Sequence, residues 1–261
     1  MQLPRPSGIV TLLSDFGLAD PWVGIMKGVV KRHNPAADVL DYCHGVPAHD
    51  VRVGAFFLAA VVDRFPPGTV HVAVVDPGVG TARRALVACA AGCFWVAPDN
   101  GLLESILRRD DVEVRAVDID KLDLRPASRT FHGRDVFAPL GGMLSSGRFG
   151  FRALGDRVAD PCRLDGDPFA PEASPCVIAV DRFGNLITNV GLARVQSEGW
   201  AAVRVRDHVV PLVATYAEAA PGEALALINS YDLLEVAINR GSAAERLRVS
   251  VGATFEPIVQ R

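Results

Sequence analysis

The sequence predicts an α/β N-terminal domain with a central, mostly parallel sheet, followed by a smaller, mostly β, barrel-like C-terminal domain. In residues 1–160, short apolar runs alternate with amphipathic stretches of helical period, which is typical of strands joined by helical crossovers. Residues 161–175 are rich in proline and aspartate and follow no period, so we expect a linker there. In residues 176–261, short β-branched runs are separated by Gly, Pro or Asn, and helical periods are few.

The N-terminal domain is expected to contain several strands and at least three helices. The run at 70–75 has His71 as its one polar residue, and such continuous apolar runs are typical of buried parallel strands. Apolar residues at helical spacing predict helices over 22–33 and 51–64, and a further helix begins at Val136. The predicted strands cover residues 9–13, 39–42, 70–75, 85–90 and 94–97.

The C-terminal domain, residues 176–261, is expected to be a small barrel or sandwich. Its apolar runs are too short for helices and are bounded by turn-forming residues. The predicted strands cover residues 176–180, 186–190, 202–206, 224–229, 234–239 and 247–251.

Composition and charge exclude several classes of function. The 27 Lys and Arg against 30 Asp and Glu give a net charge of −3, so no basic field is present to hold a nucleic acid. No uncharged run approaches the roughly 18 apolar residues that a membrane span needs, so we expect no membrane partner. The five cysteines form an odd set without a Cys-x-x-Cys pair, which argues against a disulfide framework and against a zinc knuckle. We therefore expect a cytoplasmic protein.

Asp15 follows directly on the first predicted strand. Ligands of open α/β sheets bind outside the carboxyl ends of the strands, and an ionised carboxylate accepts from two hydroxyls at once. Asp15 is therefore a candidate for holding a ribose diol. The alternative is that it satisfies only the backbone N–H groups of its own turn. Asp20 and Pro21 are then expected as the N-cap and the first residue of the following helix.

Two further loops place charged and imidazole groups beside predicted strand or helix ends. Asp76 ends a buried strand, before a loop with two glycines whose backbone can approach a ligand closely. Arg83 and Arg84 follow, so a guanidinium could lie near the Asp76 carboxylate, although a solvent-facing arginine pair is the alternative. His132 lies in a loop before the helix at Val136, where an ordinary hydrogen-bonded histidine is the alternative.

Other polar segments leave more than one interpretation open. The loops at 98–101, 181–185 and 229–230 could read the edge of a base or an amino-acid head group, but ordinary turns contain the same residue types. Four residues of metal-ligand types also cluster between 41 and 50, although their spacing does not support a metal site. These residues are Asp41, His44, His49 and Asp50. We therefore expect no metal and no cofactor.

Seven segments in chain order carry a resemblance to one family. They are TLLSDFGLADPWVGIMKGVV at 11–30, HDVRVGAFFLA at 49–59, GTVHVAVVDPGVGTARRA at 68–85, APDNGLL at 97–103, TFHGRDVFAP at 130–139, DRFGNLITN at 181–189 and LALINSYDLLEVAINRGSAAERL at 225–247. Together they resemble the adenosine-forming S-adenosyl-L-methionine (SAM) hydrolases, also called SAM hydroxide adenosyltransferases, which are related to SAM-dependent fluorinases and chlorinases. The resemblance covers nearly the whole chain.

The resemblance implies a homotrimer, with SAM bound between the N-terminal domain of one subunit and the C-terminal domain of its neighbour. It implies a catalytic triad of Asp76, Arg83 and His132. It also implies a set of substrate-binding residues, of which the first is the ribose-binding acid and the others bind the base and the methionine part. These are Asp15, Asp181, Phe183, Asn185 and Ser230.

Two positions bear on how far the resemblance extends. In the halogenase branch a Ser or a Gly follows the position of His132, and this chain has Gly133 there, so the serine associated with fluoride capture is missing. Asp181 stands one residue nearer to Phe183 than the corresponding acid of fluorinases does, which weakens the assignment of its individual role.

The function implied is hydrolysis of SAM to adenosine and L-methionine by water or hydroxide attack on the ribose C5′. A sulfonium leaves as a neutral thioether, so activation of water is the difficult step. The sequence leaves open whether Asp76 or His132 takes the proton. A metal-dependent nucleoside hydrolase, favoured by the acid-Pro-Gly at 76–78, and a SAM-binding or adenosine-binding protein without turnover are the alternatives.

Overall fold

The computed structural model describes residues 3–165 and 173–259. The chain divides into two compact units, Met1–Asp165 and Gly166–Arg261. The linker over 161–175 stays a prediction, and residues 166–172 of it lie outside the described residues. No helix in the described ranges is long and apolar enough to cross a membrane. All five cysteines carry free thiols.

The N-terminal unit is built on one six-stranded sheet with the strand order β2-β1-β3-β5-β4-β6. The pairs β1·β2, β1·β3 and β3·β5 are parallel, whereas β4 runs antiparallel to both β5 and β6. The strands are β1 (Ile9–Ser14), β2 (Asp38–Cys43), β3 (Val70–Val74), β4 (Ala85–Ala90), β5 (Cys93–Pro98) and β6 (Glu113–Ala116). The α/β prediction with a central, mostly parallel sheet is confirmed. The sheet is mixed, because β4 runs against the other five strands.

A two-residue turn explains why β4 and β5 pair in opposite directions. Ala91 and Gly92 join the two strands, and both have positive φ values, 54° and 68°. A turn with both central residues in this region matches the twist of an antiparallel hairpin and leaves no room for a crossover helix. Only Gly92 carries a sequence signal for such a turn, because alanine rarely adopts a positive φ.

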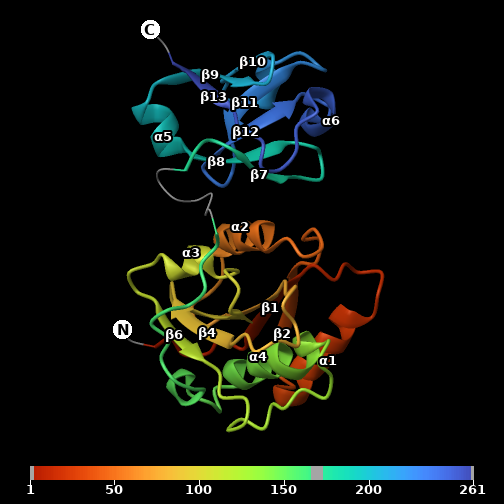
Figure 1. Ribbon diagram of the computed structural model, residues 1–261, viewed down its shortest axis with the longest axis vertical. Coiled ribbons are helices and arrows are strands. Elements are labelled where there is room, and N and C mark those ends of the chain that lie inside the picture. The colour runs from red at the N-terminus through yellow and green to blue at the C-terminus, as the bar shows by residue number, and fades with distance from the viewer. Residues whose placement is uncertain (1–2, 166–172, 260–261) are drawn as a thin grey trace. The chain divides into compact units, whose positions relative to one another are not determined.

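Helices cover both faces of this sheet, as Figure 1 shows. On one face, α1 (Trp22–His33) and α4 (Ala138–Ser145) pack on Val10 and Leu12 of β1. On the other face, α2 (Val51–Val61) and α3 (Glu104–Leu107) pack against a second apolar cluster that contains Leu13. Successive residues of β1 therefore enter opposite cores, which is why its sequence is a continuous apolar run. The structure places the carboxyl ends of β1 and β3 at the same edge.

Some element boundaries differ from the predictions. The N-cap of α1 is Pro21 rather than Asp20, and no side chain caps this helix. Helix α2 ends at Val61, three residues before the predicted end at 64, and Asp50 caps its start. The predicted helix at Val136 begins as a π-helical turn, Gly133–Phe137, which continues into α4. Strand β6 and helix α3 were not predicted.

The C-terminal unit is mostly β, as predicted, with two described sheets. The strands of one sheet follow the order β11-β12-β8-β7 and those of the other the order β10-β9-β13. The elements are β7 (Val177–Val180), β8 (Leu186–Gly191), α5 (Leu192–Ser197), β9 (Trp200–Val205), β10 (His208–Pro211), a 3-10 turn (Tyr216–Glu218), β11 (Ala224–Ile228), β12 (Leu233–Ile238), α6 (Ala243–Leu247) and β13 (Glu256–Val259). A barrel-like closure of these sheets stays a prediction.

The strand predicted over 247–251 is wrong. Leu247 is the last residue of α6, and Arg248 adopts a left-handed conformation with φ 53° that ends the helix. The helix starts at Ser242, whose hydroxyl accepts a hydrogen bond from the Glu245 backbone N–H. A capped helix start therefore competes successfully with the β propensity of the short run that follows.

His71 is buried in the middle of the sheet and gives a testable pH dependence of stability. Its ring stacks on Trp95 at 4.2 Å between centroids, and its Nδ1 lies 2.8 Å from Thr11 Oγ1. Burial lowers the pKa of this imidazole from 6.5 to about 3. Because the unfolded chain binds a proton below pH 6.5 and the folded chain does not until about pH 3, the folded state loses stability as the pH falls through this window.

We expect His71 to contribute a fall of up to about 1.4 kcal/mol per pH unit in the free energy of unfolding between pH 6 and 4. Urea unfolding at a series of pH values measures this slope for the wild type and for His71→Gln. The variant should show a shallower slope, since other titrating groups are common to both proteins. Identical slopes would exclude the neutral, buried imidazole.

Candidate active site

A cavity of about 240 Å³ opens at the edge of the N-terminal sheet. Its walls come from the loops that follow β1 and β3, from the loop before α2 and from the loop before the π-helical turn. The residues that line it are Asp15, Phe16, Ala48, His49, Val74, Asp76, Val79, Thr130, Phe131, His132 and Gly133. The structure thus brings three of the predicted site residues, Asp15, Asp76 and His132, to one cavity.

Arg83 joins Asp76 and His132 into one hydrogen-bonded array. Its Nε donates to Asp76 Oδ1 at 2.8 Å, and its Nη2 donates to Asp76 Oδ2. The same Nη2 lies 3.0 Å from Nδ1 of His132. The guanidinium also lies over the ring of Phe137, at 5.2 Å from the centroid. The side chains of Arg83 and Asp76 are only 10% and 5% exposed. The alternative in which Arg83 faces solvent is therefore wrong.

The neighbouring Arg84 forms a separate ion pair. Its Nε donates to Asp99 Oδ2 at 2.6 Å, and its Nη1 donates to Asp160 Oδ1 at 3.2 Å. Asp99 is nearly as buried as Asp76, with 6% of its side chain exposed. Two adjacent arginines therefore each pair with a buried carboxylate, Arg83 with Asp76, which lines the cavity, and Arg84 with Asp99, which does not.

The contact with Arg83 fixes the protonation of His132. A guanidinium has no acceptor atoms, so Nδ1 of His132 accepts the hydrogen bond and a neutral ring carries its hydrogen on Nε2. Burial and the positive charge of Arg83 lower the pKa of His132 below its ordinary value, while the charges of Asp76 and Asp135 act in the opposite direction. His132 is therefore a neutral imidazole with an Nε2–H donor at pH 7.

A close backbone approach holds the two loops of this array together. Gly80 has φ 80°, and a Cβ built on it would lie 2.5 Å from the carbonyl oxygen of Arg129. Any other residue at this position would force apart the loop that carries Asp76 and the loop that carries His132. Directly after His132 the chain forms the π-helical turn, a feature that is frequent at functional sites.

Asp15 is held by a loop other than its own. Its Oδ2 accepts from the backbone N–H of His49 at 2.8 Å, and His49 itself has φ 66°. The side chain is 8% exposed and lines the cavity. The interpretation in which Asp15 serves only its own turn is therefore wrong, and Oδ1 is available to a ligand.

The residues of metal-ligand types between 41 and 50 have other partners. His44 is buried, with its Nδ1 at 2.7 Å from Ser14 Oγ and its Nε2 at 3.1 Å from Asp41 Oδ1. Asp50 accepts from the backbone N–H of Val53 at the start of α2. Within the described ranges, no group of three or more His, Cys, Asp or Glu side chains is arranged to hold a metal ion.

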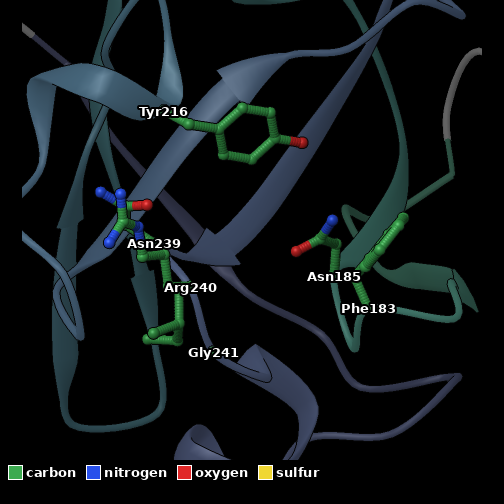
Figure 2. A pocket seen from close by; sticks show the side chains of 7 residues that line it. Phe183, Asn185, Tyr216, Asn239, Arg240 and Gly241 are labelled. Atoms are coloured by element: carbon green, nitrogen blue, oxygen red, sulfur yellow. The ribbon is translucent and has the colours of Figure 1, made fainter.

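The C-terminal unit contains a second cavity, of about 490 Å³. Its lining combines aromatic, amide and guanidinium groups: Phe183, Asn185, Tyr216, Ile238, Asn239, Arg240 and Gly241. In Figure 2, Asn185 and Phe183 face Asn239 and Arg240 across the cavity, and the Tyr216 ring lies above the space between them. Phe183 is 74% exposed although it is a large apolar side chain, so its ring can stack on a planar ligand.

Asp181 organises the loop that carries Phe183 and Asn185. Its Oδ1 accepts from the backbone N–H groups of Phe183 and Asn185, at 2.8 and 2.9 Å. Its Oδ2 accepts from Asn185 Nδ2 at 2.9 Å. Both carboxylate oxygens therefore serve the loop itself, and Asn185 is held with one amide N–H engaged and its Oδ1 available.

Two of the predicted binding residues lie outside the lining of the C-terminal cavity as far as the described residues define it. One is Asp181, and the other is Ser230, which is exposed in the turn between β11 and β12. Conversely, Tyr216, Asn239 and Arg240 line this cavity and were not predicted as binding residues from the sequence. A polar Asn-Arg-Gly segment, which begins at the last residue of the strand predicted over 234–239, is the signal that could have found the last two.

Comparison with known proteins gives the family. Residues 10–155 match the SAM hydroxide adenosyltransferase N-terminal domain, and residues 175–256 match the C-terminal domain of the same name. The chain belongs to the SAM hydroxide adenosyltransferase family. It is 40% identical to an (R)-S-adenosyl-L-methionine hydrolase of Thermus thermophilus, over 93% of this chain and 96% of that protein. It is 26% identical to a fluorinase of Nocardia brasiliensis, over 95% of this chain and 96% of that protein.

A solved structure has the same fold as this chain. The crystal structure of an uncharacterised conserved protein from Thermotoga maritima superposes with a TM-score of 0.87 at 33% sequence identity. The match covers 95% of this chain and all of that chain. The predicted resemblance to this family, with the fluorinases as more distant relatives, is confirmed.

Proposed function

We propose that this protein hydrolyses SAM to adenosine and L-methionine. The observation that carries this proposal is the array of Asp76, Arg83 and His132 at a cavity that also contains the Asp15 carboxylate. A buried acid, a guanidinium and a neutral imidazole in mutual contact are the groups that water activation needs, whereas ligand binding alone does not require all three. The (R)-S-adenosyl-L-methionine hydrolase of Thermus thermophilus is a relative at 40% identity.

In the proposed reaction, a water oxygen forms a bond to the ribose C5′ as the bond between C5′ and sulfur breaks. The bonding electron pair goes to sulfur, which converts the sulfonium into the neutral thioether of methionine. The water loses one proton, which finally passes to solvent. Arg83 stabilises the negative charge that develops on the water oxygen, and the enclosed cavity strengthens this interaction. In-line attack requires the water to lie opposite the sulfur.

Asp76 is the proton acceptor in this proposal. The Nδ1 lone pair of His132 is engaged by Arg83, and its Nε2 already carries hydrogen, so the neutral ring can donate to the water but has no lone pair for the proton. Each carboxylate oxygen of Asp76 has a second lone pair beyond its bond to Arg83. His132 then orients the water by donating to its oxygen.

The remaining predicted residues are proposed to hold the substrate. Asp15 accepts from the ribose hydroxyls through Oδ1. The Phe183 ring stacks on the adenine base, and the amide of Asn185 pairs with a donor and an acceptor on the base edge, as asparagine does with adenine elsewhere. Ser230 binds the amino-acid head of methionine. Asp181 supports Asn185 and Phe183 through the loop rather than by contact with SAM.

We also propose a homotrimer with the site at the subunit interface. The N-terminal cavity, at about 240 Å³, is smaller than the roughly 300 Å³ at which ligand pockets of drug-sized molecules begin, which supports a site completed by a second surface. Multi-angle light scattering on the purified protein gives the mass of the assembly. The free thiols support a cytoplasmic location, where thiols stay reduced.

The test of the function is to incubate purified protein with SAM and separate the products by chromatography. Stoichiometric adenosine and methionine, with activity unchanged by EDTA, support the proposal. Release of free adenine, with activity lost to EDTA and restored by Ca²⁺, would instead identify a metal-dependent nucleoside hydrolase. Retention of SAM without turnover would identify a binding protein.

The role of His132 predicts a specific pH dependence. Because its pKa lies below the ordinary 6.5 and the neutral ring is the active form, kcat/KM should be constant above pH 6.5 and fall on the acid side of that value. His132→Ala should lower kcat/KM by roughly 10²-fold. His132→Gln keeps an N–H donor but cannot act as a base, so it should retain clearly more activity than His132→Ala. Equal activities of the two variants would make His132 the base.

A further inference from the structure

Glu235 is a buried carboxylate in β12 for which the proposed reaction has no use. It is 4% exposed. Its Oε1 accepts from the hydroxyl of Tyr216, and its Oε2 accepts from Nδ2 of Asn229 at 3.3 Å. Both partners are neutral, and no Lys or Arg pairs with it in the described part of the chain. Burying a carboxylate without a cation is costly, so the burial of Glu235 calls for a structural or functional reason.

One of these bonds reaches the wall of the C-terminal cavity. Tyr216 lines that cavity and belongs to a 3-10 turn closed by a reciprocal capping contact between Thr215 and Glu218. Burial and the hydrogen bond to Glu235 raise the pKa of the Tyr216 hydroxyl above its ordinary value, so the hydroxyl remains a donor. Glu235 thereby fixes the orientation of a ring that lies above the space between Asn185 and Asn239 in Figure 2.

The other bond reaches the turn that exposes Ser230. The Oδ1 of Asn229 accepts from the backbone N–H groups of Tyr231 and Leu233, at 2.9 and 3.2 Å. Its Nδ2 is the group that donates to Glu235. The amide of Asn229 is therefore held in one orientation, with its oxygen toward the turn and its nitrogen toward Glu235.

We propose that Glu235 is a positioning residue for the substrate, because one carboxylate fixes both the Tyr216 wall of the cavity and the turn that presents Ser230. It sets the separation between the groups that hold the base and the group that holds the amino-acid end of SAM. This inference rests on the proposed function for the identity of the ligand. The hydrogen-bond network itself is independent of that function.

A reciprocal exchange of acid and amide tests the coupling. In Glu235→Gln one of the two bonds is lost in either orientation of the amide. With Oε1 toward Tyr216, the amide N–H faces Nδ2 of Asn229 and two donors meet; with Oε1 toward Asn229, the Tyr216 hydroxyl loses its acceptor. In Asn229→Asp two carboxylates meet, while Oδ1 can still accept from Tyr231 and Leu233. The double variant restores a donor–acceptor pair in the opposite sense and keeps the acceptor for Tyr216.

We expect each single variant to raise KM for SAM by roughly 10-fold with kcat within about 2-fold of wild type, and the double variant to return KM to within about 3-fold. Unchanged KM in both single variants, or a double variant no better than either, would overturn the proposal. Wild-type protein that releases no adenosine would refute the proposed function instead.

A measurement without substrate separates positioning from general stability. Hydrogen exchange of the Tyr231 and Leu233 amides should be faster in each single variant and return toward wild type in the double variant, with thermal midpoints recorded for all four proteins. If Glu235→Gln does not fold, Tyr216→Phe and Asn229→Asp test the two bonds one at a time. Wild-type KM values in both of those variants would overturn the inference.

Discussion

Arg83→Ala is expected to lower kcat/KM for SAM hydrolysis by roughly 10²- to 10³-fold. The guanidinium contacts both Asp76 and His132, so in the proposed mechanism its removal leaves the developing charge on water without a stabilising cation and leaves His132 without its hydrogen-bond donor. The loss should fall mainly on kcat, because Arg83 acts on the attacking water rather than on the bound substrate. Steady-state kinetics with chromatographic detection of adenosine measure it.

The adjacent arginine supplies a matched control. Arg84→Ala removes a guanidinium of similar charge that pairs with Asp99 and Asp160. We expect this variant to keep kcat/KM within about 3-fold of wild type, because the Arg84 guanidinium pairs with Asp99 and Asp160, neither of which lines the cavity. Equal losses in the two variants would mean that Arg83 acts through the stability of this region and has no part in the reaction.

Asp76→Asn is expected to lower kcat by roughly 10²-fold or more. The amide keeps the size of the carboxylate and one acceptor oxygen for Arg83, but it cannot take the proton of the attacking water. It also leaves the charge of Arg83 uncompensated in a buried site. The same adenosine assay, with thermal unfolding to confirm that the variant is folded, measures the effect.

Asp99→Asn is the corresponding control. Asp99 and Asp76 are nearly equally buried, and each pairs with one of the two adjacent arginines. The two variants should differ in activity by about 10²-fold. Asp99→Asn should lose less stability than Asp76→Asn, because Arg84 is more exposed than Arg83 and also pairs with Asp160. If Asp76→Asn keeps wild-type kcat, the acid is not the proton acceptor, and the assignment of roles to Asp76 and His132 must be exchanged.

The proximity of Asp15, Asp76 and Arg83 is the part of the candidate site that the sequence predicted best. Asp15 and Asp76 follow strands whose carboxyl ends meet at one edge, so their proximity follows from a general rule for such sheets. Arg83 follows Asp76 within one loop, and its contact was foreseen as one of two alternatives. The position of His132 rested on the family resemblance, because a loop far along the chain gives no sign of which strand edge it covers.

The sequence predicted neither the antiparallel direction of β4 nor the end of helix α6 at Leu247, where a strand over 247–251 was expected. The turn at Ala91 and Gly92 depends on a positive φ at an alanine, for which the sequence carries no signal. The start of α6 did carry one, because Ser242 and Glu245 have the spacing of a capped helix. The β-branched residues after it outweighed that signal in our interpretation.

Tyr216 illustrates a limit of another kind. It reaches the C-terminal cavity from a short 3-10 turn, and its orientation depends on Glu235, which lies 19 positions away in the sequence. No local pattern of residues around Tyr216 distinguishes it from an ordinary surface tyrosine. Cavity residues whose orientation depends on a partner far away in the sequence can be identified only when the fold is known.

The charges in the N-terminal cavity bear on what happens after the chemical step. Asp76 and Arg83 compensate each other and His132 is neutral, whereas Asp15 accepts from the uncharged backbone N–H of His49, with Nδ1 of the His49 ring 4.0 Å from its Oδ2. With a neutral His49 ring, the pocket carries an excess negative charge, which would attract the sulfonium of the proposed substrate. Once the carbon–sulfur bond is broken, adenosine and the methionine thioether are both uncharged at this point, so the attraction vanishes and the site does not retain what it has made.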